Sequence, residues 1–447
     1  MRHRASRGGS PDSPSSGAPD ASRSSRPAGP HPLVAVLLVA VVALVSGGLV
    51  YLLLGTTSQS PAPTASPPTT APPVAPGSVG PGSGVATTGL HTSGAAILAP
   101  DGQRFAPYGF VLECLAMQDL SCEHPSDPGL TDSAKIEAAA SFWHANAVRL
   151  QVAQEHLFSS SPYDTAYLAA LDSEVQLANH LGMVVSITLQ EEDFSGPPLP
   201  TASAEHFWTF MARHFASSPG VVFDLYNEPK LLPYQGQDWL WNIWRNGGQV
   251  SVNGVDDTFV GMQALVDAVR ATGADNLIVA EGNGNDHDLT EVTTHLLTGG
   301  NIAYGFEPNL KIHSQTPAQW DTAFGDASAT VPLVMDAFRD YATGSDCLAD
   351  TPTVLPQLFA YLVAHHLGLL VWTLDAGNTF VGANPDQPTS YPDGVTQLCV
   401  PHDHQHRAIA VGSGVGYNPD TNTNGPGADI LGFFRAHSAT LTLPPPA

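Results

Sequence analysis

The residues best suited to chemistry are Asn227 and Glu228, which directly follow a short apolar run at 221–226. Val, Phe and Tyr dominate this run, which predicts a buried strand. Pro229 comes next and cannot donate a hydrogen bond to a strand ladder, so the strand must end there. A carboxyl group at the edge of a buried strand is suited to act as a general acid. The alternative is that Asn-Glu-Pro only opens a loop.

Short apolar segments alternate with helical patterns along residues 90–447, which predicts a parallel sheet with crossover helices. The predicted strands are 107–112, 147–151, 183–189, 221–226, 276–280, 302–306, 332–337 and 368–374. The predicted helices are 132–144, 163–180, 203–216, 258–271, 288–298, 316–323, 351–366 and 427–437. Eight strands in this order favour an α/β fold of the (β/α)8 TIM-barrel type, with a doubly wound open sheet as the alternative. In a barrel of this type the catalytic face lies at the carboxyl ends of the strands.

Other polar or aromatic residues fall at the ends of further predicted strands. Arg149 lies in the second, Glu307 follows the sixth, Asp336 lies in the seventh and Trp372 in the eighth. If the strands form a barrel, these residues and Glu228 belong to one site.

At these positions the chain resembles family 5 of the glycoside hydrolases, the cellulase-type enzymes, over roughly residues 100–440. Arg149 matches the Arg that closes strand two, and Asn227 and Glu228 match the Asn-Glu that closes strand four. Trp372 matches a Trp near the end of strand eight. The resemblance implies that Glu228 is the acid/base, that Asn227 contacts the 2-hydroxyl group of the sugar, and that Trp372 forms a sugar platform. It also implies a β-linked glucan or mannan as the partner, and no cofactor.

Two strand ends depart from the family pattern. The His-x-Tyr pair of strand six reads Glu-Pro-Asn at 307–309. The family's nucleophile stands five places after a Pro in strand seven, and five places after Pro332 is Ala337. Asp336 is adjacent, but neighbouring side chains of a strand point to opposite faces. Asp336 could therefore serve only if the register shifts by one residue or a bulge redirects it.

The second carboxyl group decides between two functions. Retaining glycosidases need two carboxyl groups about 5–5.5 Å apart, and inverting enzymes need about 6.5–9.5 Å. Glu228 supplies one; Glu307 or Asp336 would supply the other, unless Glu307 pairs with Arg149 or Arg339. The first hypothesis is an active glycosidase, and the second is a catalytically inactive carbohydrate-binding protein. A purely structural cell-envelope protein is a third hypothesis, which would require a filled cleft.

The first 89 residues do not resemble a folded domain. Residues 1–32 are rich in Ser, Pro, Gly and Arg, which predicts a disordered tail. Residues 33–54 are uncharged and apolar, which predicts a transmembrane helix. Residues 55–89 form a linker rich in Pro, Ser and Thr. The arginines before the apolar segment place the tail in the cytoplasm, so the 90–447 barrel domain of this single-pass cell-membrane protein is expected to be extracellular.

Charge and cysteine content limit the partners. The chain has 16 Lys and Arg residues against 41 Asp and Glu residues, a net charge of −25. This balance argues against nucleic-acid binding and fits a neutral oligosaccharide or polysaccharide partner for a monomeric protein. Four cysteines in an oxidising compartment predict two disulfides, Cys114–Cys122 and Cys347–Cys399, with the exchanged pairings open. We expect no metal at the His-rich tract 402–406 or at the Asp/Asn turn 420–425.

Overall fold

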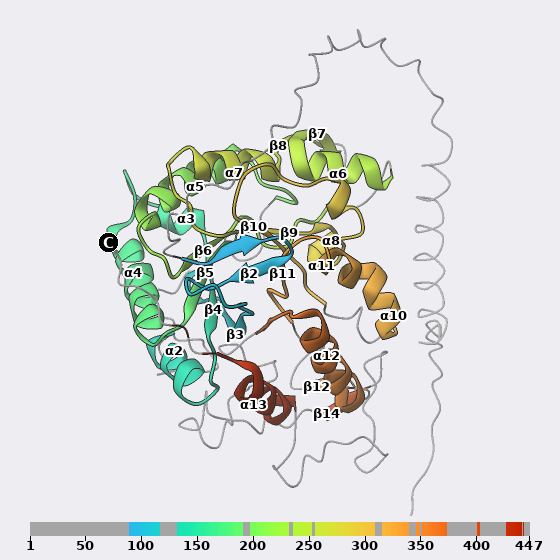
Figure 1. The fold of residues 1–447 in the computed structure, drawn as a ribbon. Coiled ribbons are helices and arrows are strands. Elements are labelled where there is room, and N and C mark those ends of the chain that lie inside the picture. The colour runs from blue at the N-terminus through green and yellow to red at the C-terminus, as the bar shows by residue number, and fades with distance from the viewer. Residues whose placement is uncertain are drawn as a thin grey trace, which may run out of the picture. The chain divides into compact units, whose positions relative to one another are not determined.

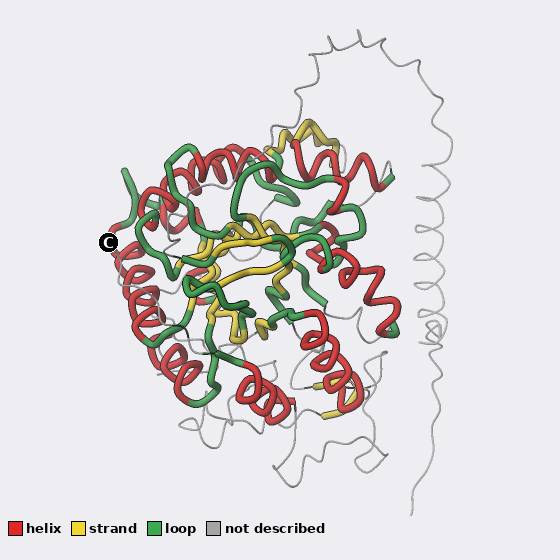
Figure 2. The backbone as a smooth tube through the Cα atoms, viewed as in Figure 1, coloured by secondary structure: helices red, strands yellow, loops and turns green. Residues whose placement is uncertain are grey.

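Eight parallel strands form the centre of the molecule, surrounded by helices (Figures 1 and 2). In chain order they are β3 (Tyr108–Leu112), β4 (Ala147–Val152), β5 (Val184–Leu189), β6 (Val221–Asp224), β9 (Ile278–Glu281), β10 (Ile302–Gly305), β11 (Leu333–Val334) and β13 (Leu369–Val371). From β3 to β11 each strand pairs with the next one in this order, and β13 pairs with β3. A parallel bridge between Phe338 and Val371 joins the two remaining edges. The sheet is thus a nearly closed (β/α)8-type barrel, as predicted.

The computed structural model describes residues 89–116, 132–190, 197–231, 236–252, 255–308, 315–338, 346–348, 351–372, 400–402, 426–439 and 441. These residues all belong to one compact unit, Ser83–Ala447. The predicted tail 1–32, the predicted transmembrane segment 33–54 and nearly all of the linker 55–89 lie outside the described residues. So do the tracts at 403–406 and 420–425. The predicted domain boundaries therefore stay predictions.

The helices around the barrel begin and end close to the predicted positions. They are α2 (Asp132–Ser141), α3 (Gln154–Leu157), α4 (Thr165–His180), α5 (Ala202–Phe215), α7 (Met262–Arg270), α10 (Pro317–Trp320) with η4 (Asp321–Gly325) and α11 (Asp326–Ser328), α12 (Thr351–His365) and α13 (Pro426–His437). Local sequence explains the starts: the Asp164 side chain accepts hydrogen bonds from the first backbone amides of α4. In α7, Met262, Leu265, Val266 and Val269 form one buried face at helical spacing.

Two helix predictions were wrong in their extent. The predicted helix 258–271 begins at Met262, because 258–260 belong to a β-hairpin formed by β7 (Gly247–Val252) and β8 (Val255–Val260). This hairpin and α6 (Gln237–Asn246) make up the insertion after the fourth barrel strand. The predicted helix 288–298 contains only the 3₁₀ turn η3 (Val292–Thr294), after the short α8 (Asn283–Asp286).

The barrel interior changes from apolar to polar along each strand. Its apolar layer contains one or two residues from each strand: Val111, Ala147, Val184, Val222, Leu277, Val279, Ala303, Val334 and Leu370. Leu90 and Ile97, in and beside the hairpin of β1 (His91–Ser93) and β2 (Ala96–Leu98), join this layer. Because side chains of a strand alternate, the next inward positions lie two residues further along. They carry Arg149, Asp224 and Glu281, which places the polar groups at the carboxyl end of the barrel.

The prediction of a membrane-spanning protein is not supported. Among the helices of the described ranges, none is long and apolar enough to cross a membrane. The longest of them, α4, has 16 residues, whereas a transmembrane helix needs about 20 apolar residues. The predicted localisation, a single-pass membrane protein with its barrel outside the cell, is corrected on this finding.

The cysteine predictions are tested in part. Cys114, in the 3₁₀ turn η1 (Cys114–Ala116), is disulfide-bonded, and no described cysteine is free. Cys122 and Cys399 lie outside the described residues, so both predicted pairings stay predictions. The parallel strands β12 (Asp346–Leu348) and β14 (Val400–His402) place Cys347 opposite Pro401.

Candidate active site

Arg149, on β4, is the centre of a buried hydrogen-bond network at the carboxyl end of the barrel. Its Nε donates to Asp224 Oδ2 at 2.8 Å, and its Nη2 donates to Asn227 Oδ1 at 3.0 Å. The same Nη2 pairs with Glu281 Oε1. Thr188 Oγ1 also donates to Asp224 Oδ2, at 2.7 Å. The guanidinium group thus connects the ends of three barrel strands.

Asn227 is oriented by two donors. Its Oδ1 accepts from Arg149 and also from Gln151 Nε2 at 3.0 Å. Because Arg149 and Gln151 occupy the amide oxygen, the NH₂ group is the part of the Asn227 side chain that can donate a hydrogen bond to a ligand. The predicted neighbours Arg149 and Asn227 therefore do lie together.

Glu281 is a site residue that the sequence analysis missed. It is the last residue of β9, fully buried, and its Oε2 accepts the backbone N–H of Glu228 at 2.5 Å. The indole Nε1 of Trp244 donates to the Glu281 carbonyl at 2.9 Å. The signal was present in the sequence: an acidic residue ends the apolar run 276–280, one place beyond the predicted strand.

Glu228 is half-buried and has an unusual backbone. Its φ of 48° lies in the left-handed region, which non-glycine residues rarely adopt. Within the described residues, its carboxyl group makes no hydrogen bond. A carboxyl group without a hydrogen-bond partner, on a backbone held in place by Glu281, is suited to bind a ligand.

The seventh strand contains a bulge, and its Asp336, two residues beyond inward-facing Val334, points into the barrel. Leu370 N donates to Met335 O and Trp372 N donates to Phe338 O, both at 2.9 Å. The step from Leu370 to Trp372 is two residues, whereas the step from Met335 to Phe338 is three. The seventh strand therefore contains one extra residue. The Asp336 side chain is turned into the barrel: a Cβ added at Gly305, on β10, would lie 2.0 Å from Asp336 Oδ2.

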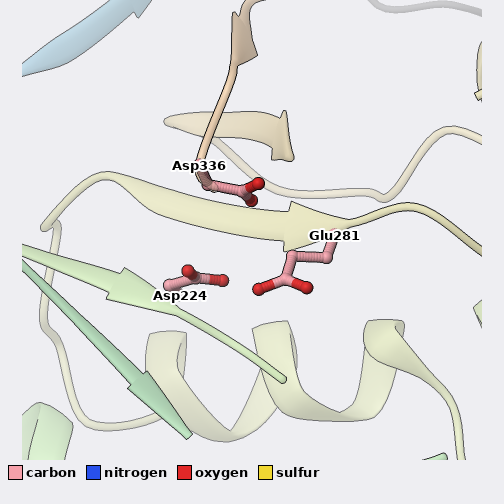
Figure 3. A group of neighbouring side chains, drawn as sticks. All are labelled: Asp224, Glu281 and Asp336. Atoms are coloured by element: carbon pink, nitrogen blue, oxygen red, sulfur yellow. The ribbon is translucent and has the colours of Figure 1, made fainter. Parts of the chain in front are cut away.

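Asp336 lies close to two other carboxyl groups in the barrel (Figure 3). Carboxyl oxygens of Asp224, Glu281 and Asp336 lie within 4.8 Å of one another. Asp336 is 1% exposed, and its side chain is hydrogen-bonded to the neighbouring acid Asp286 and not to a basic, amide or hydroxyl group of the described residues. Ala337, the position aligned with the family's nucleophile, packs with Leu370 in the apolar layer.

Glu307 lies in a second acidic group. Oxygens of Asp286, Glu307 and Asp336 lie within 4.8 Å of one another, and all three residues are buried. The ion pairs of Arg149 go to Asp224 and Glu281, so the predicted pairing of Glu307 with Arg149 is not found. Arg339 lies outside the described residues. Carboxylate oxygens suit a hard cation such as Ca²⁺, but their proximity alone does not define a metal site, and the first group already contains Arg149.

Burial disfavours ionisation of Glu281, Asp286 and Asp336. Burial raises the pKa of Glu281 and of Asp286 well above the usual range; at Glu281 the ion pair with Arg149 opposes this, and at both residues neighbouring carboxyl groups add to it. Burial also raises the pKa of Asp336, to about 6, although Arg149 acts in the opposite direction. Burial alone would lower the pKa of Arg149, but Asp224 and Glu281 keep it well above its usual value.

Trp372 follows the eighth strand and is partly buried. Its indole Nε1 donates to Glu113 Oε1, just beyond the end of β3. The ring packs against the apolar layer of the barrel. The structure thus places the predicted aromatic residue at the same end of the barrel as Arg149 and Glu228.

The comparisons with known proteins agree with this geometry. Residues 117–336 match the model of the cellulase family, glycosyl hydrolase family 5. The chain carries a glycosyl hydrolase family 5 domain. A search of curated proteins found no match.

Solved structures of similar fold come from bacteria and an archaeon. A β-glucanase from Saccharophagus degradans in complex with cellotetraose has 17% identity and a TM-score of 0.52, covering 66% of this chain and 87% of its own. The catalytic domain of the major endoglucanase from Xanthomonas campestris pv. campestris has 18% identity and a TM-score of 0.51, covering 68% and 96%. An endocellulase from Pyrococcus horikoshii has 15% identity and a TM-score of 0.52, covering 69% and 97%. At these identities the likeness shows the fold.

Proposed function

We propose that this protein hydrolyses a β-linked glucan, with Glu228 as acid/base and Asp336 as the second carboxyl group. The observation that carries the proposal is the place of the Asp336 carboxyl group inside the barrel, within 4.8 Å of Asp224 and Glu281. Asp336 lies two residues beyond Val334 of the inner apolar layer, so strand alternation directs it inward. An acid from strand seven thereby joins a site that contains Arg149 and Asn227.

The choice of a glucan rests on the fold and on the site chemistry. The similar structures are described as a β-glucanase, an endoglucanase and an endocellulase, and the first holds cellotetraose. Asn227 offers an amide NH₂ to a sugar hydroxyl group, and Trp372 offers an aromatic ring to a sugar face. These groups suit an uncharged oligosaccharide, as does the acidic chain.

Two routes of hydrolysis are open to these residues. In both, protonated Glu228 donates its proton to the glycosidic oxygen as the C1–O bond breaks. In the retaining route the Asp336 carboxylate attacks C1, and a water molecule deprotonated by Glu228 then releases the sugar. In the inverting route Asp336 instead removes a proton from the water that attacks C1. The anomer formed first, measured by NMR, distinguishes the two routes.

The test is cellotetraose hydrolysis by the full-length chain. We expect Glu228→Gln and Asp336→Asn to lower kcat by about 10²–10⁴-fold, the usual contribution of a positioned acid or base. Glu307→Gln serves as the matched control, because it neutralises a neighbouring buried acid, and we expect a much smaller loss. Absence of hydrolysis by the wild-type chain, or full activity of Asp336→Asn, would overturn the proposal.

A second candidate is a glucan-binding protein without turnover. The observation in its favour is Ala337, a buried small residue at the position aligned with the family's nucleophile. This function predicts cellotetraose binding by calorimetry, weakened by Trp372→Ala, with no product formed. In that case Ala337→Glu is the variant expected to gain activity.

A further inference from the structure

We infer that Glu281 is a positioning residue that holds the acid/base Glu228 in its working geometry. The inference rests on the proposed role of Glu228 and adds a residue of a different strand to that site. Both oxygens of Glu281 already have partners, Arg149 and the Glu228 N–H, so neither is available to a substrate. Glu281 acts through the Glu228 backbone, whose N–H it accepts at 2.5 Å.

The backbone around Glu228 needs such a contact. A left-handed φ at a non-glycine residue persists only where the surroundings impose it. Backbone hydrogen bonds fix the neighbours: Asn227 N donates to Leu189 O at 2.9 Å, and Lys230 N donates to Pro198 O at 2.8 Å. Glu228 itself has the carboxylate of Glu281 as the acceptor for its N–H. This contact therefore sets the direction in which the Glu228 side chain leaves the barrel.

Glu281 is itself held on two further sides. Its Oε1 pairs with Arg149, whose Nη2 also donates to Asn227 Oδ1. Its carbonyl oxygen accepts from Trp244 Nε1. A single buried carboxylate thus links the arginine that orients Asn227 to the backbone that presents Glu228.

Asp224 offers a matched control. It is also fully buried and also pairs with Arg149, but it makes no contact with Glu228 among its described hydrogen bonds. Its Oδ2 accepts from both Arg149 and Thr188, while Oδ1 has no described partner. In Asp224→Asn, the amide oxygen can keep both bonds, with the NH₂ group at the place of Oδ1.

Glu281→Gln cannot keep both of its bonds. Each oxygen of Glu281 accepts from a different donor, Arg149 on one side and the Glu228 N–H on the other. An amide has one oxygen and one NH₂ group, so one of these donors must face another donor. Both substitutions replace a buried carboxyl group beside Arg149 with an amide, and only Glu281→Gln disturbs Glu228.

The experiment compares two substrates whose need for the acid differs. Cellotetraose needs its leaving oxygen protonated, whereas 2,4-dinitrophenyl β-cellobioside has a leaving group that departs without a proton. We expect Glu281→Gln to lower kcat on cellotetraose by about 10²-fold, the effect of a small misplacement of a reacting group. On the dinitrophenyl substrate the loss should be at least tenfold smaller. Asp224→Asn should lose equally on both substrates. An equal loss for Glu281→Gln would overturn the inference.

A second readout does not depend on turnover or on the variants folding. In the wild-type chain, hydrogen exchange resolved to the Glu228 amide should be slow, because a buried carboxylate accepts that N–H. Fast exchange there overturns the inference. In folded Glu281→Gln the amide should exchange at least tenfold faster, and in Asp224→Asn it should not change. If the wild-type chain hydrolyses neither substrate, the proposed function fails, and this exchange measurement alone decides the role of Glu281.

Discussion

The two sides of the barrel's polar end differ in how their acids are compensated. On one side, Asp224 and Glu281 both pair with Arg149, and each accepts a further hydrogen bond. On the other side, Asp286 and Asp336 lie within 4.8 Å of each other, and the side-chain hydrogen bond of Asp336 is to Asp286, another acid without a paired cation among the described residues. We call these the paired side and the unpaired side.

The difference indicates different roles. Buried ionised groups that are paired and hydrogen-bonded stabilise a single geometry, and removal of one partner is costly. Buried acids that repel one another lower stability and are typical of functional sites. The paired side therefore supports Asn227 and Glu228, while the unpaired side keeps a carboxyl group available. Stability measurements on variants of each side test this assignment.

Arg149→Met should have the largest effect, because it leaves Asp224 and Glu281 buried without their cation. Loss of one partner of a buried ion pair costs about 3–5 kcal/mol. We expect a loss of that size in the free energy of unfolding, measured by chemical denaturation. Arg245→Met is the control, since Arg245 is bonded to Leu296 O and Asn246 at the surface. A similar loss in both variants would contradict the paired side's importance.

Gly305→Ala should lower both the stability of the protein and its kcat, because it displaces Asp336 on the unpaired side. The added Cβ would lie 2.0 Å from Asp336 Oδ2 and 2.9 Å from Glu281 Cγ, so the Asp336 side chain must move. Overpacking of this kind costs about 1–3 kcal/mol, and we expect kcat on cellotetraose to fall in parallel. Gly300→Ala is the matched control, because nothing lies within 4 Å of its Cβ position. Normal kcat in Gly305→Ala would show that Asp336 is not needed where it lies.

Asp336→Asn should stabilise the protein at pH 7 while it lowers activity. Removing a buried charge among other acids relieves repulsion, and we expect a midpoint of thermal unfolding a few degrees higher. Asp224→Asn provides the comparison from the paired side, where the same change removes a charge that Arg149 needs, so its midpoint should fall. Shifts of the same sign in both variants would remove the distinction between the two sides.

The smallest effect concerns pH. The pKa of Asp336 is raised to about 6 in the folded protein, chiefly by burial, from a usual value of 3.8. The folded state then binds more protons than the unfolded state between these values, so this residue's contribution to stability falls as pH rises from about 4 to about 6. In Asp336→Asn the decline over that range should be shallower. An unchanged slope would show that Asp336 titrates normally.

Catalytic activity should rise with pH over the range in which the stability contribution of Asp336 falls. Asp336 must be ionised to attack C1 or to take a proton from water, so kcat/KM should fall as pH drops below about 6. A pH profile of cellotetraose hydrolysis by the wild-type chain measures this. Full activity at pH 4.5 would argue against Asp336 as the second carboxyl group.

The sequence by itself determined most of the scaffold and half of the candidate site. All eight predicted strands are present, because each is a local apolar run with recognisable ends. The end of strand four at Pro229 follows from proline's missing N–H. Arg149, Asn227 and Trp372 could be placed at the same face because the carboxyl ends of parallel strands in a barrel share one side.

Tertiary structure alone decided the other half. The direction of Asp336 depends on the register of strand seven: Val334 pairs with Gly305 of the distant strand β10 and faces inward, and Asp336 is the next inward position. The role of Glu281 depends on two donors, Arg149 and the Glu228 N–H, more than 50 residues away in the chain. Local patterns contain no information on such contacts, because a carboxylate's partners are set by packing across the barrel.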